Sequence, residues 1–365
     1  MRAFTVQQFS HPLEAVEVTT PEPKGTEVLV EVTRCGVCHT DLHLQDGYYS
    51  LGGGKRLNLK DRGIVPPLVL GHEIYGKLIA KGPAVSDEQC EVGREYVVYP
   101  WMGCGTCDQC LQEHDNLCAT PKSLGVARPG GYADLCLVPH PKYLVDVSGI
   151  EPSLAATYAC SGLTAYSAIN KVEIDRESEL LVILGLGGVG MNALNIAVAQ
   201  GFARIAVADL DPGKRGFALS AGAHLSFDPA NLEELQALLS EHGSAAAVVD
   251  FVGSSDTAAL GVSMLRKGGT YVIVGLFGGE LTIPLPPLAQ RSTVLRGSYV
   301  GTLQELKELV QLAKAGKIAA LSVETVAFSQ VNEALDKLRA GNVNGRLVLA
   351  KDNQSVMTEQ SRAPS

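Results

Sequence analysis

Residues Glu179–Gly190 read ELLVILGLGGVG, and the architecture of the chain is built around them. An apolar run typical of a buried strand, Glu179–Leu184, passes directly into the glycine pattern G-x-G-x-x-G. A second apolar run, Gly190–Gln200, has the length of a helix and closes at Gly201. A strand, a glycine turn and a helix in this order predict the first unit of an α/β sheet.

Beyond this turn, short apolar strands alternate with helices. The predicted strands are Arg204–Ala208, Ala245–Val252, Thr270–Gly275 and Val294–Val300, and the predicted helices are Gly213–Gly222, Thr257–Leu265 and Leu303–Ala315. A further helix, Leu154–Ile169, precedes them. The alternation predicts an α/β fold with a doubly wound parallel sheet of the Rossmann type.

The glycine turn is a candidate dinucleotide site, and its five motif residues would let the backbone approach a pyrophosphate at a helix N-terminus: Gly185, Gly187, Gly188, Val189 and Gly190. Asp209 ends the next strand, nineteen residues after Gly190. A carboxylate there accepts hydrogen bonds from the adenosine ribose and repels a 2′-phosphate. We therefore predict NAD as the cofactor in preference to NADP.

Two alternatives to an NAD site stay open. Lys214, a further candidate for cofactor binding, and Arg215 are close enough in sequence to accommodate a 2′-phosphate. A glycine turn between a strand and a helix can also be purely structural.

Length and composition limit the class of protein. The chain has 365 residues, which predicts two domains, and its 46% hydrophobic and 19% charged residues are typical of a globular protein. A net charge of −9 argues against nucleic acid or an anionic membrane as the main partner. Residues 1–20 have no apolar signal-peptide core, and no apolar run is long enough to span a bilayer. We expect a cytoplasmic protein with a small-molecule substrate.

Nine cysteines without a secretion signal do not indicate a disulfide framework. Four of them have the spacing C-x2-C-x2-C-x7-C, which predicts a structural zinc site: Cys104, Cys107, Cys110 and Cys118. An iron–sulfur or redox centre is the less favoured alternative. Cys35, Cys90 and Cys136 are interpreted as small buried hydrophobic residues.

A catalytic zinc site is predicted from the segment CHTDLH, which begins at Cys38. It combines a thiolate ligand, a hydroxyl and two imidazoles, and a catalytic zinc needs three protein ligands and an open position. His72 and Cys160 are the other candidate ligands, and Glu73 beside His72 is a supporting residue or an occasional ligand. Taken singly, each of these residues is more often structural. Cys160 begins the nucleotide-binding half, so the metal is expected between the two domains.

The first part of the chain is predicted to be mostly β, with strands at Ala3–Val6, Glu27–Thr33, Val92–Pro100 and Leu135–Val138. Residues 47–67 (GYYSLGGGKRLNLKDRGIVPP) are predicted to be a long loop at the rim of the substrate cleft. Residues 320–350 rejoin this part and end in a strand at Gly345–Leu349. We expect a catalytic domain of 1–155 and 298–350, a nucleotide domain of 156–297, and a flexible tail of 351–365.

Taken together, these motifs resemble the zinc-dependent medium-chain alcohol dehydrogenase family over almost the whole chain. The resemblance implies a GroES-like catalytic domain, two zinc ions, and catalytic zinc ligands at Cys38, His72 and Cys160. It also implies that Thr40 bonds the substrate oxygen and His43 passes the proton to solvent. Further implied roles are a nicotinamide contact at Thr164, a pyrophosphate contact at Arg346 and a pocket wall at Trp101. Tyr48–Asp61 resembles the 6-hydroxyhexanoate dehydrogenases more narrowly.

The expected function is therefore NAD-dependent oxidation of a primary or secondary alcohol. We expect a medium-chain aliphatic or aromatic substrate. An ω-hydroxy acid is a further option if Lys55, Arg56, Lys60 and Arg62 attract its carboxylate. A polyol dehydrogenase and a dinucleotide-binding module without turnover are the alternatives. The resemblance implies a homodimer or homotetramer, with Val294–Val300 as a candidate for pairing between subunits.

Overall fold

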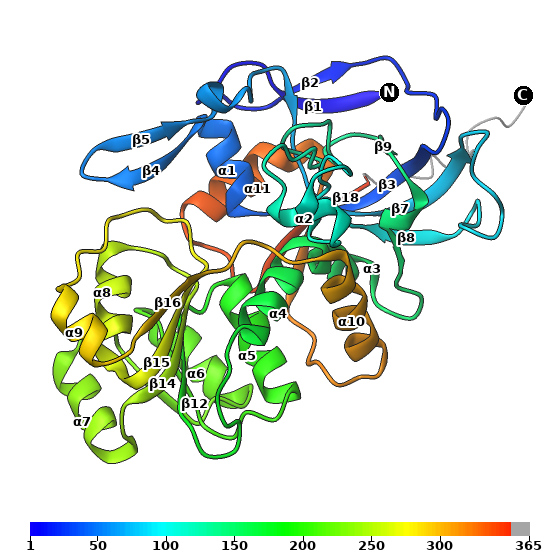
Figure 1. The fold of residues 1–365 in the computed structure, drawn as a ribbon. Coiled ribbons are helices and arrows are strands. Elements are labelled where there is room, and N and C mark those ends of the chain that lie inside the picture. The colour runs from blue at the N-terminus through cyan, green and yellow to red at the C-terminus, as the bar shows by residue number, and fades with distance from the viewer. Residues whose placement is uncertain (352–365) are drawn as a thin grey trace, which may run out of the picture.

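The computed structural model describes residues 1–351 and shows two halves, each built on its own β-sheet (Figure 1). In the first half, a mixed sheet has the order β10-β8-β7-β3-β18-β17, with β9 also paired to β3. Its strands are β3 (Val28–Val37), β7 (Glu73–Lys81), β8 (Glu95–Val98), β9 (Leu135–Val138), β10 (Leu144–Asp146), β17 (Val323–Ala327) and β18 (Arg346–Ala350). A small sheet of β2 (Glu14–Glu17), β1 (Arg2–Val6) and β6 (Leu68–Val69) lies beside it.

The second half is a parallel sheet of order β13-β12-β11-β14-β15-β16. Its strands are β11 (Leu181–Leu184), β12 (Ile205–Ala208), β13 (Leu225–Phe227), β14 (Ala245–Asp250), β15 (Leu265–Ile273) and β16 (Val294–Gly297). The helices that follow or connect them are α5 (Gly188–Ala199), α6 (Pro212–Ser220), α7 (Leu232–His242), α8 (Ser255–Met264), α9 (Leu285–Gln290) and α10 (Leu303–Lys314). The central strands β11, β12 and β14 are buried throughout, as expected of a sheet covered on both faces.

The predicted fold class is confirmed, with strand and helix boundaries shifted by a few residues. Three elements of the second half were missed: β13, which is only three residues long, α7 and the six-residue α9. The long loop predicted for residues 47–67 is wrong in detail. This segment contains a hairpin of β4 (Tyr48–Gly52) and β5 (Lys55–Asn58), followed by a 3-10 turn at Leu59–Arg62. Three consecutive glycines with positive φ, Gly52 to Gly54, make its tip, and this turn signal was overlooked.

The helix predicted at Leu154–Ile169 lies between the two halves but is not continuous. It consists of α3 (Pro152–Thr157), a π-helical turn at Tyr158–Gly162, and α4 (Leu163–Asn170). The Ser161 hydroxyl donates to Thr157 O at 2.9 Å inside this turn. Such π turns within helices often occur at functional sites, and this one contains Cys160.

The chain returns to the first half after α10. β18 pairs antiparallel with β3, and α11 (Val331–Arg339) contacts α1 (His39–Asp46). The proposed domain boundaries near residues 155 and 297 stay predictions. The expected flexible tail, from residue 352 on, lies outside the described residues.

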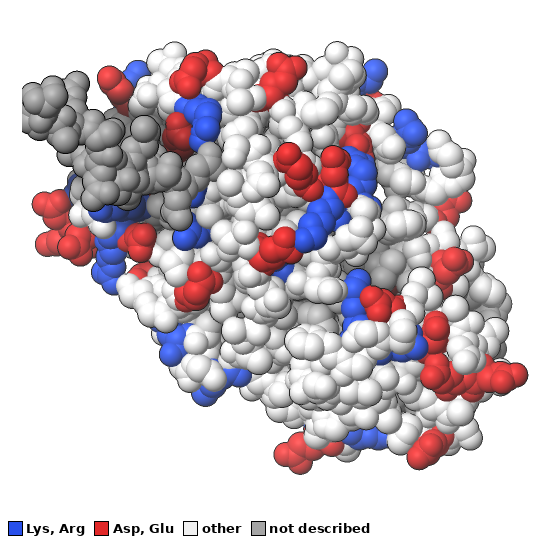
Figure 2. All heavy atoms as spheres, turned by 180° about the vertical axis from the view of Figure 1, so that it is seen from behind, with Lys and Arg blue, Asp and Glu red and all other residues white. Residues whose placement is uncertain are grey.

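No helix within residues 1–351 is long and apolar enough to cross a membrane. Figure 2 shows acidic and basic side chains interspersed over the back of the molecule, with wide uncharged areas between them.

Candidate active site

Helix α1 begins where strand β3 ends, and this junction sets the position of Cys38. Cys38 is the N-cap of the helix, and its backbone N–H donates to Asp41 Oδ2 at 2.9 Å. Gly47 ends the helix in the left-handed conformation, with φ of 84°. The short helix thus carries Thr40 and His43 on a fixed frame beside Cys38.

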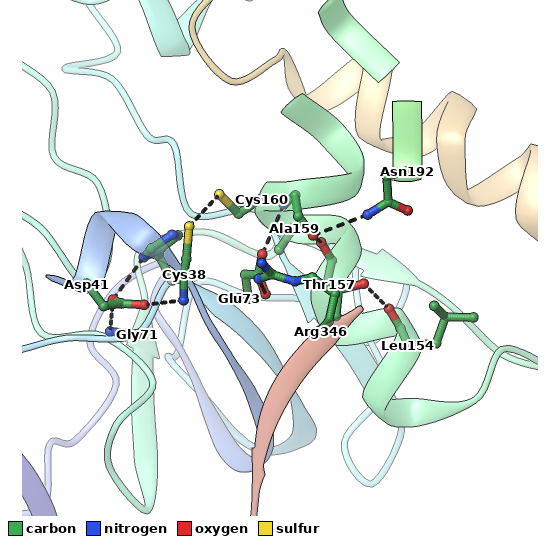
Figure 3. Close-up of polar contacts among 12 residues, drawn as sticks. Cys38, Asp41, Gly71, Glu73, Leu154, Thr157, Ala159, Cys160, Asn192 and Arg346 are labelled. Carbon is green, nitrogen blue, oxygen red and sulfur yellow. Dashed lines mark hydrogen bonds and ion pairs between the residues drawn. The ribbon is translucent and has the colours of Figure 1, made fainter. Parts of the chain in front are cut away.

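The three predicted catalytic ligands come together. One ligand atom from each of Cys38, His72 and Cys160 lies within 4.8 Å of the other two, and all three residues are buried. The two sulfurs are 3.9 Å apart, and Figure 3 shows them pointing toward each other from α1 and the π-helical turn. A tetrahedral zinc with Zn–S bonds of about 2.3 Å needs sulfurs about 3.8 Å apart, so the spacing fits zinc.

Of the two thiols in this cluster, Cys38 favours the thiolate form, whereas contact with Cys38 and burial raise the pKa of Cys160. The pKa of Cys38 is held well below that of a free thiol, first by its contact with Cys160 and then by His72. Both ring nitrogens of His72 are buried without a hydrogen-bond partner in the described residues. Nδ1 lies 3.3 Å from Asp41 Oδ1 and faces this carboxylate. The lone pair of Nε2 is therefore the one that a metal could use.

Asp41 supports the cluster from one side. It is fully buried, and besides Cys38 N it accepts hydrogen bonds from Gly71 N at 3.2 Å and the Tyr132 hydroxyl at 3.0 Å. Burial lowers the pKa of His72, but the charge and hydrogen bonding of Asp41, together with those of Cys38, outweigh burial and raise the pKa overall. The carboxylate thus orients the imidazole of His72 and increases its basicity.

Glu73 and Arg346 lie on the other side of the cluster (Figure 3). Glu73 Oε2 is 2.6 Å from Arg346 Nη2, and Glu73 Oε1 accepts from Ser161 N at 3.0 Å. With both oxygens engaged, Glu73 is outside the three-ligand group. Its role as an occasional ligand stays a prediction.

Arg346 connects the metal cluster to the glycine turn. A Cβ at Gly188 would lie 2.4 Å from Arg346 Cδ, so the arginine stem packs against the start of α5. Its Nε is buried with no hydrogen-bond partner among residues 1–351, which leaves one donor for a ligand at this helix N-terminus.

The glycine turn has the shape that a dinucleotide requires. Gly185 has φ of 85°, and a Cβ there would meet Val252 at 2.6 Å, while a Cβ at Gly190 would lie 1.8 Å from Gly185 O. The Cβ position of Gly187 faces open space. These are the three functions of the motif: a tight turn, close packing of helix on strand, and room for a pyrophosphate.

Asp209 lies beside this turn, and its Oδ2 accepts from Leu186 N at 2.7 Å. Lys214 is near the start of α6, whereas the Arg215 guanidinium donates to the carbonyls of Asp209 and Leu210. Thr164 on α4 is buried with its hydroxyl unpaired in the described chain, as a ligand contact would need.

Aromatic side chains form the wall beside the metal cluster. The Trp101 ring is 5.2 Å from the His72 ring and 6.0 Å from that of Tyr299, and its Nε1 donates to Ala159 O at 3.0 Å. Desolvation raises the pKa of Tyr299, and the charge of Cys160 adds to the rise. Thr40 and His43 are partly exposed on α1, and the His43 ring is 4.6 Å from that of Tyr49.

The four-cysteine lobe forms a second metal-type cluster, with one sulfur from each cysteine inside a 4.8 Å group. Sulfur–sulfur distances are 3.9 Å for Cys104–Cys110, 3.5 Å for Cys107–Cys110 and 3.8 Å for Cys107–Cys118. Hydrogen bonds from the hydroxyl and backbone of Thr106 lower the pKa of Cys104 to about 5, as suits a thiolate. Four thiolates at tetrahedral spacing leave no position for a substrate.

Sequence reasoning missed several residues of the site. Asp41 lies within the CHTDLH motif, but its contact with His72 was not predicted. A charged residue three positions after a predicted ligand could have indicated that contact. Tyr49 and Tyr299 gave no sequence signal, since nothing local shows that Tyr49 contacts His43 or that Tyr299 contacts Trp101.

These features are those of an α/β protein with a dinucleotide-type glycine turn and three candidate metal ligands between its halves. The alcohol dehydrogenase GroES-like domain matches residues 24–149, and the zinc-binding dehydrogenase domain matches residues 188–315. An NAD-dependent alcohol dehydrogenase of Sulfurisphaera tokodaii is 34% identical, with 96% of this chain and 99% of that protein covered. The chain belongs to the zinc-type medium-chain alcohol dehydrogenase family and is an oxidoreductase.

Two further relatives show the range of this similarity. The crystal structure of the alcohol dehydrogenase from Aeropyrum pernix superposes with a TM-score of 0.86 at 29% identity, covering 96% of this chain and all of that one. A D-arabinose 1-dehydrogenase (NADP(+)) of Saccharolobus solfataricus is 30% identical, with 95% of this chain and 97% of that protein covered. The similarity therefore extends to a relative with a sugar substrate and the other nicotinamide cofactor.

Proposed function

We propose that the protein oxidises an alcohol to an aldehyde or ketone with NAD, using one catalytic zinc and one structural zinc per chain. The observation that carries the proposal is the position of Cys38, His72 and Cys160, one cluster at the junction of the halves. Arg346 lies between that cluster and the glycine turn, so the metal and cofactor sites share one cleft.

Each residue has a defined task. Cys38, His72 and Cys160 would hold the zinc, and Gly187, Arg346 and Asp209 would hold the dinucleotide. When bound, zinc acts as a Lewis acid that lowers the pKa of an alcohol, and NAD accepts the two electrons and the hydrogen as a hydride. Thr40 would accept the proton of the substrate hydroxyl while releasing its own toward His43, and His43 would carry that proton toward solvent.

NAD is favoured over NADP by the place of Asp209. Its carboxylate is fixed beside the glycine turn by Leu186 N–H, where it would repel a 2′-phosphate. Arg215 is engaged by backbone carbonyls, and Lys214 is left as the nearby cation that could offset this repulsion.

The substrate pocket is proposed to accept a medium-chain aliphatic or aromatic alcohol, because Trp101 and Tyr299 give it an aromatic wall. A panel of primary, secondary and polyhydroxylated alcohols tests this proposal. The rate of NAD reduction is measured with each alcohol, both without chelator and with an excess of chelator. Highest kcat/KM on polyols would support the polyol alternative. If the zinc-loaded protein reduced no NAD with any of the alcohols, the remaining alternative would be a dinucleotide-binding module without turnover.

An ω-hydroxy acid is the second candidate substrate, supported by one cation of the hairpin segment. Lys55 pairs with Glu280 at 2.7 Å, and the Arg56 guanidinium lies 3.9 Å from the Tyr48 ring centroid, so both are engaged elsewhere. Arg62 makes no ion pair in the described chain. Burial raises the pKa of both Tyr49 and Tyr299, and the positive charge of Arg62 opposes that rise. Equal kcat/KM of Arg62→Gln and wild type for an ω-hydroxy acid would exclude a carboxylate site there.

We also propose a homodimer or homotetramer formed through strand β16. It is an edge strand of the parallel sheet, and all four of its residues are exposed, including Val294 and Leu295. Pairing of this edge with a second copy would cover it. Sedimentation of wild type against Leu295→Lys tests the assignment, because a charge at the pairing edge should shift the mass toward the monomer.

A further inference from the structure

The β4–β5 hairpin is fixed at its base in the catalytic half. Leu59 N–H donates to Gly47 O at 2.9 Å, so the chain returns to the point at which it left α1. The Leu59 side chain is buried in the main hydrophobic core. β4 and β5 pair only with each other, and a two-stranded hairpin is marginally stable by itself. Its position therefore depends on what else it contacts.

The tip of the hairpin contacts the opposite half. Lys55 Nζ pairs with Glu280 Oε1 at 2.7 Å, and a Cβ at Gly52 would lie 3.0 Å from the Gly279 backbone. A Cβ at Gly278 would lie 2.4 Å from Ser50 O, so backbone meets backbone without room for side chains. Figure 1 shows the hairpin projecting from α1 above the Rossmann-type half.

The contacted segment, residues 278–280, belongs to the rim of the cofactor cleft. Gly278 N donates to Gly253 O at 3.0 Å, and Glu280 N donates to the Ser255 hydroxyl at 2.9 Å, just after strand β14. The same rim reaches the glycine turn, because Gly185 packs on Val252. Cofactors of doubly wound sheets bind at the carboxyl ends of the strands, where this rim lies.

At the other end of the hairpin, Tyr49 contacts the proposed proton carrier. The rings of Tyr49 and His43 are 4.6 Å apart and inclined at 38°. In the described residues, the His43 imidazole makes no hydrogen bond, so the aromatic contact is what orients it. Burial raises the pKa of Tyr49, which keeps its phenol neutral beside the imidazole.

We propose that Tyr49 is a positioning residue that orients His43 for proton transfer, and that docking of the hairpin tip on residues 278–280 holds Tyr49 in that place. The inference rests on the function proposed above, because it needs His43 as the proton carrier. It makes the geometry of the relay depend on contact between the two halves across the cofactor cleft.

The ring contact is tested by Tyr49→Ala and Tyr49→Phe, with the rate of NAD reduction measured in a single turnover. Tyr49→Ala should slow that rate about tenfold, with the KM for NAD unchanged, and a small added base should restore it by replacing the misoriented imidazole. Tyr49→Phe keeps the ring and should stay near the wild-type rate. The proposal would be overturned if Tyr49→Phe slowed the single-turnover rate as much as Tyr49→Ala does. It would also be overturned if added base did not restore the rate of Tyr49→Ala.

The tip contact is tested by K55E, E280K and the double variant. Because an exposed ion pair contributes modestly, each single change should lower the single-turnover rate by about twofold to fivefold, and the double variant should recover it. Lys60→Glu is the matched control, an exposed charge reversal on the following turn, and should not change the rate. A wild-type rate for K55E, or a double variant as slow as the singles, would overturn the coupling.

The proposed function and the role of the hairpin are separated by the activity of the wild-type protein. If the zinc-loaded wild-type protein failed to reduce NAD with every alcohol of the panel, the proposed function would be wrong. If wild type is active and these variants behave otherwise than stated, only the role of the hairpin is wrong.

Discussion

Replacing Asp41 by asparagine tests the arrangement around His72 most directly. Asp41 Oδ2 accepts from Cys38 N–H and the Tyr132 hydroxyl, and Oδ1 accepts from Gly71 N–H and faces His72 Nδ1. An asparagine has one oxygen for these two positions. Its NH2 group must therefore face at least one buried donor, whichever way the amide is turned.

The magnitude follows from this geometry. Each buried donor left without an acceptor costs about 1–3 kcal/mol, and one or two donors are affected, so we expect the free energy of unfolding to fall by about 1–6 kcal/mol. Because His72 also loses the carboxylate that orients it, zinc affinity at the catalytic site should fall by about 10–100-fold.

The assay is zinc retention against increasing chelator, with the four-cysteine zinc as an internal reference, together with denaturant unfolding. Asp46→Asn is the matched control. Asp46 is on the same helix but forms a partly exposed ion pair with Arg339 at 2.8 Å, which contributes at most about 1 kcal/mol. Catalytic-zinc affinity within twofold of wild type in Asp41→Asn would show that this carboxylate does not support the metal ligands.

Three further outcomes are expected. Asp209→Asn should lower kcat/KM for NAD by about 10–100-fold. The ratio of kcat/KM for NAD to that for NADP, measured with both cofactors, should therefore become smaller. Burial, and next the charge of His39, lower the pKa of His43 below 6.5, so His43 stays neutral and able to accept a proton as the pH falls through 6.5. The acid limb of the wild-type kcat profile should thus lie below pH 6.5, and His43→Gln should be slow mainly at low pH and rescued by buffer bases. Cys160→Ser and Cys104→Ser should each remove one of two zinc ions by metal analysis, the first abolishing turnover and the second lowering thermal stability.

Much of the site was predictable because its chemistry is local in sequence. The glycine turn, its flanking apolar runs and Asp209 fall within thirty-one residues, 179–209, and the four structural cysteines fall within fifteen, 104–118. Spacing of this kind fixes local geometry almost without reference to the rest of the chain. The sequence pattern alone therefore indicated the parallel sheet, the dinucleotide turn and the tetrahedral lobe.

Other features were decided by tertiary structure, because they join residues that no local rule connects. Cys38 and Cys160 are 122 residues apart, Glu73 and Arg346 are 273 apart, and Lys55 and Glu280 are 225 apart. Their contacts depend on the path of β18 back to β3 and on the approach of two separately built halves. The amino-acid sequence by itself determined which groups could bind zinc and a dinucleotide. Only the tertiary structure decided that Arg346 contacts Glu73 within the first half, that Tyr49 faces His43, and that the hairpin tip contacts residues 278–280 of the other half.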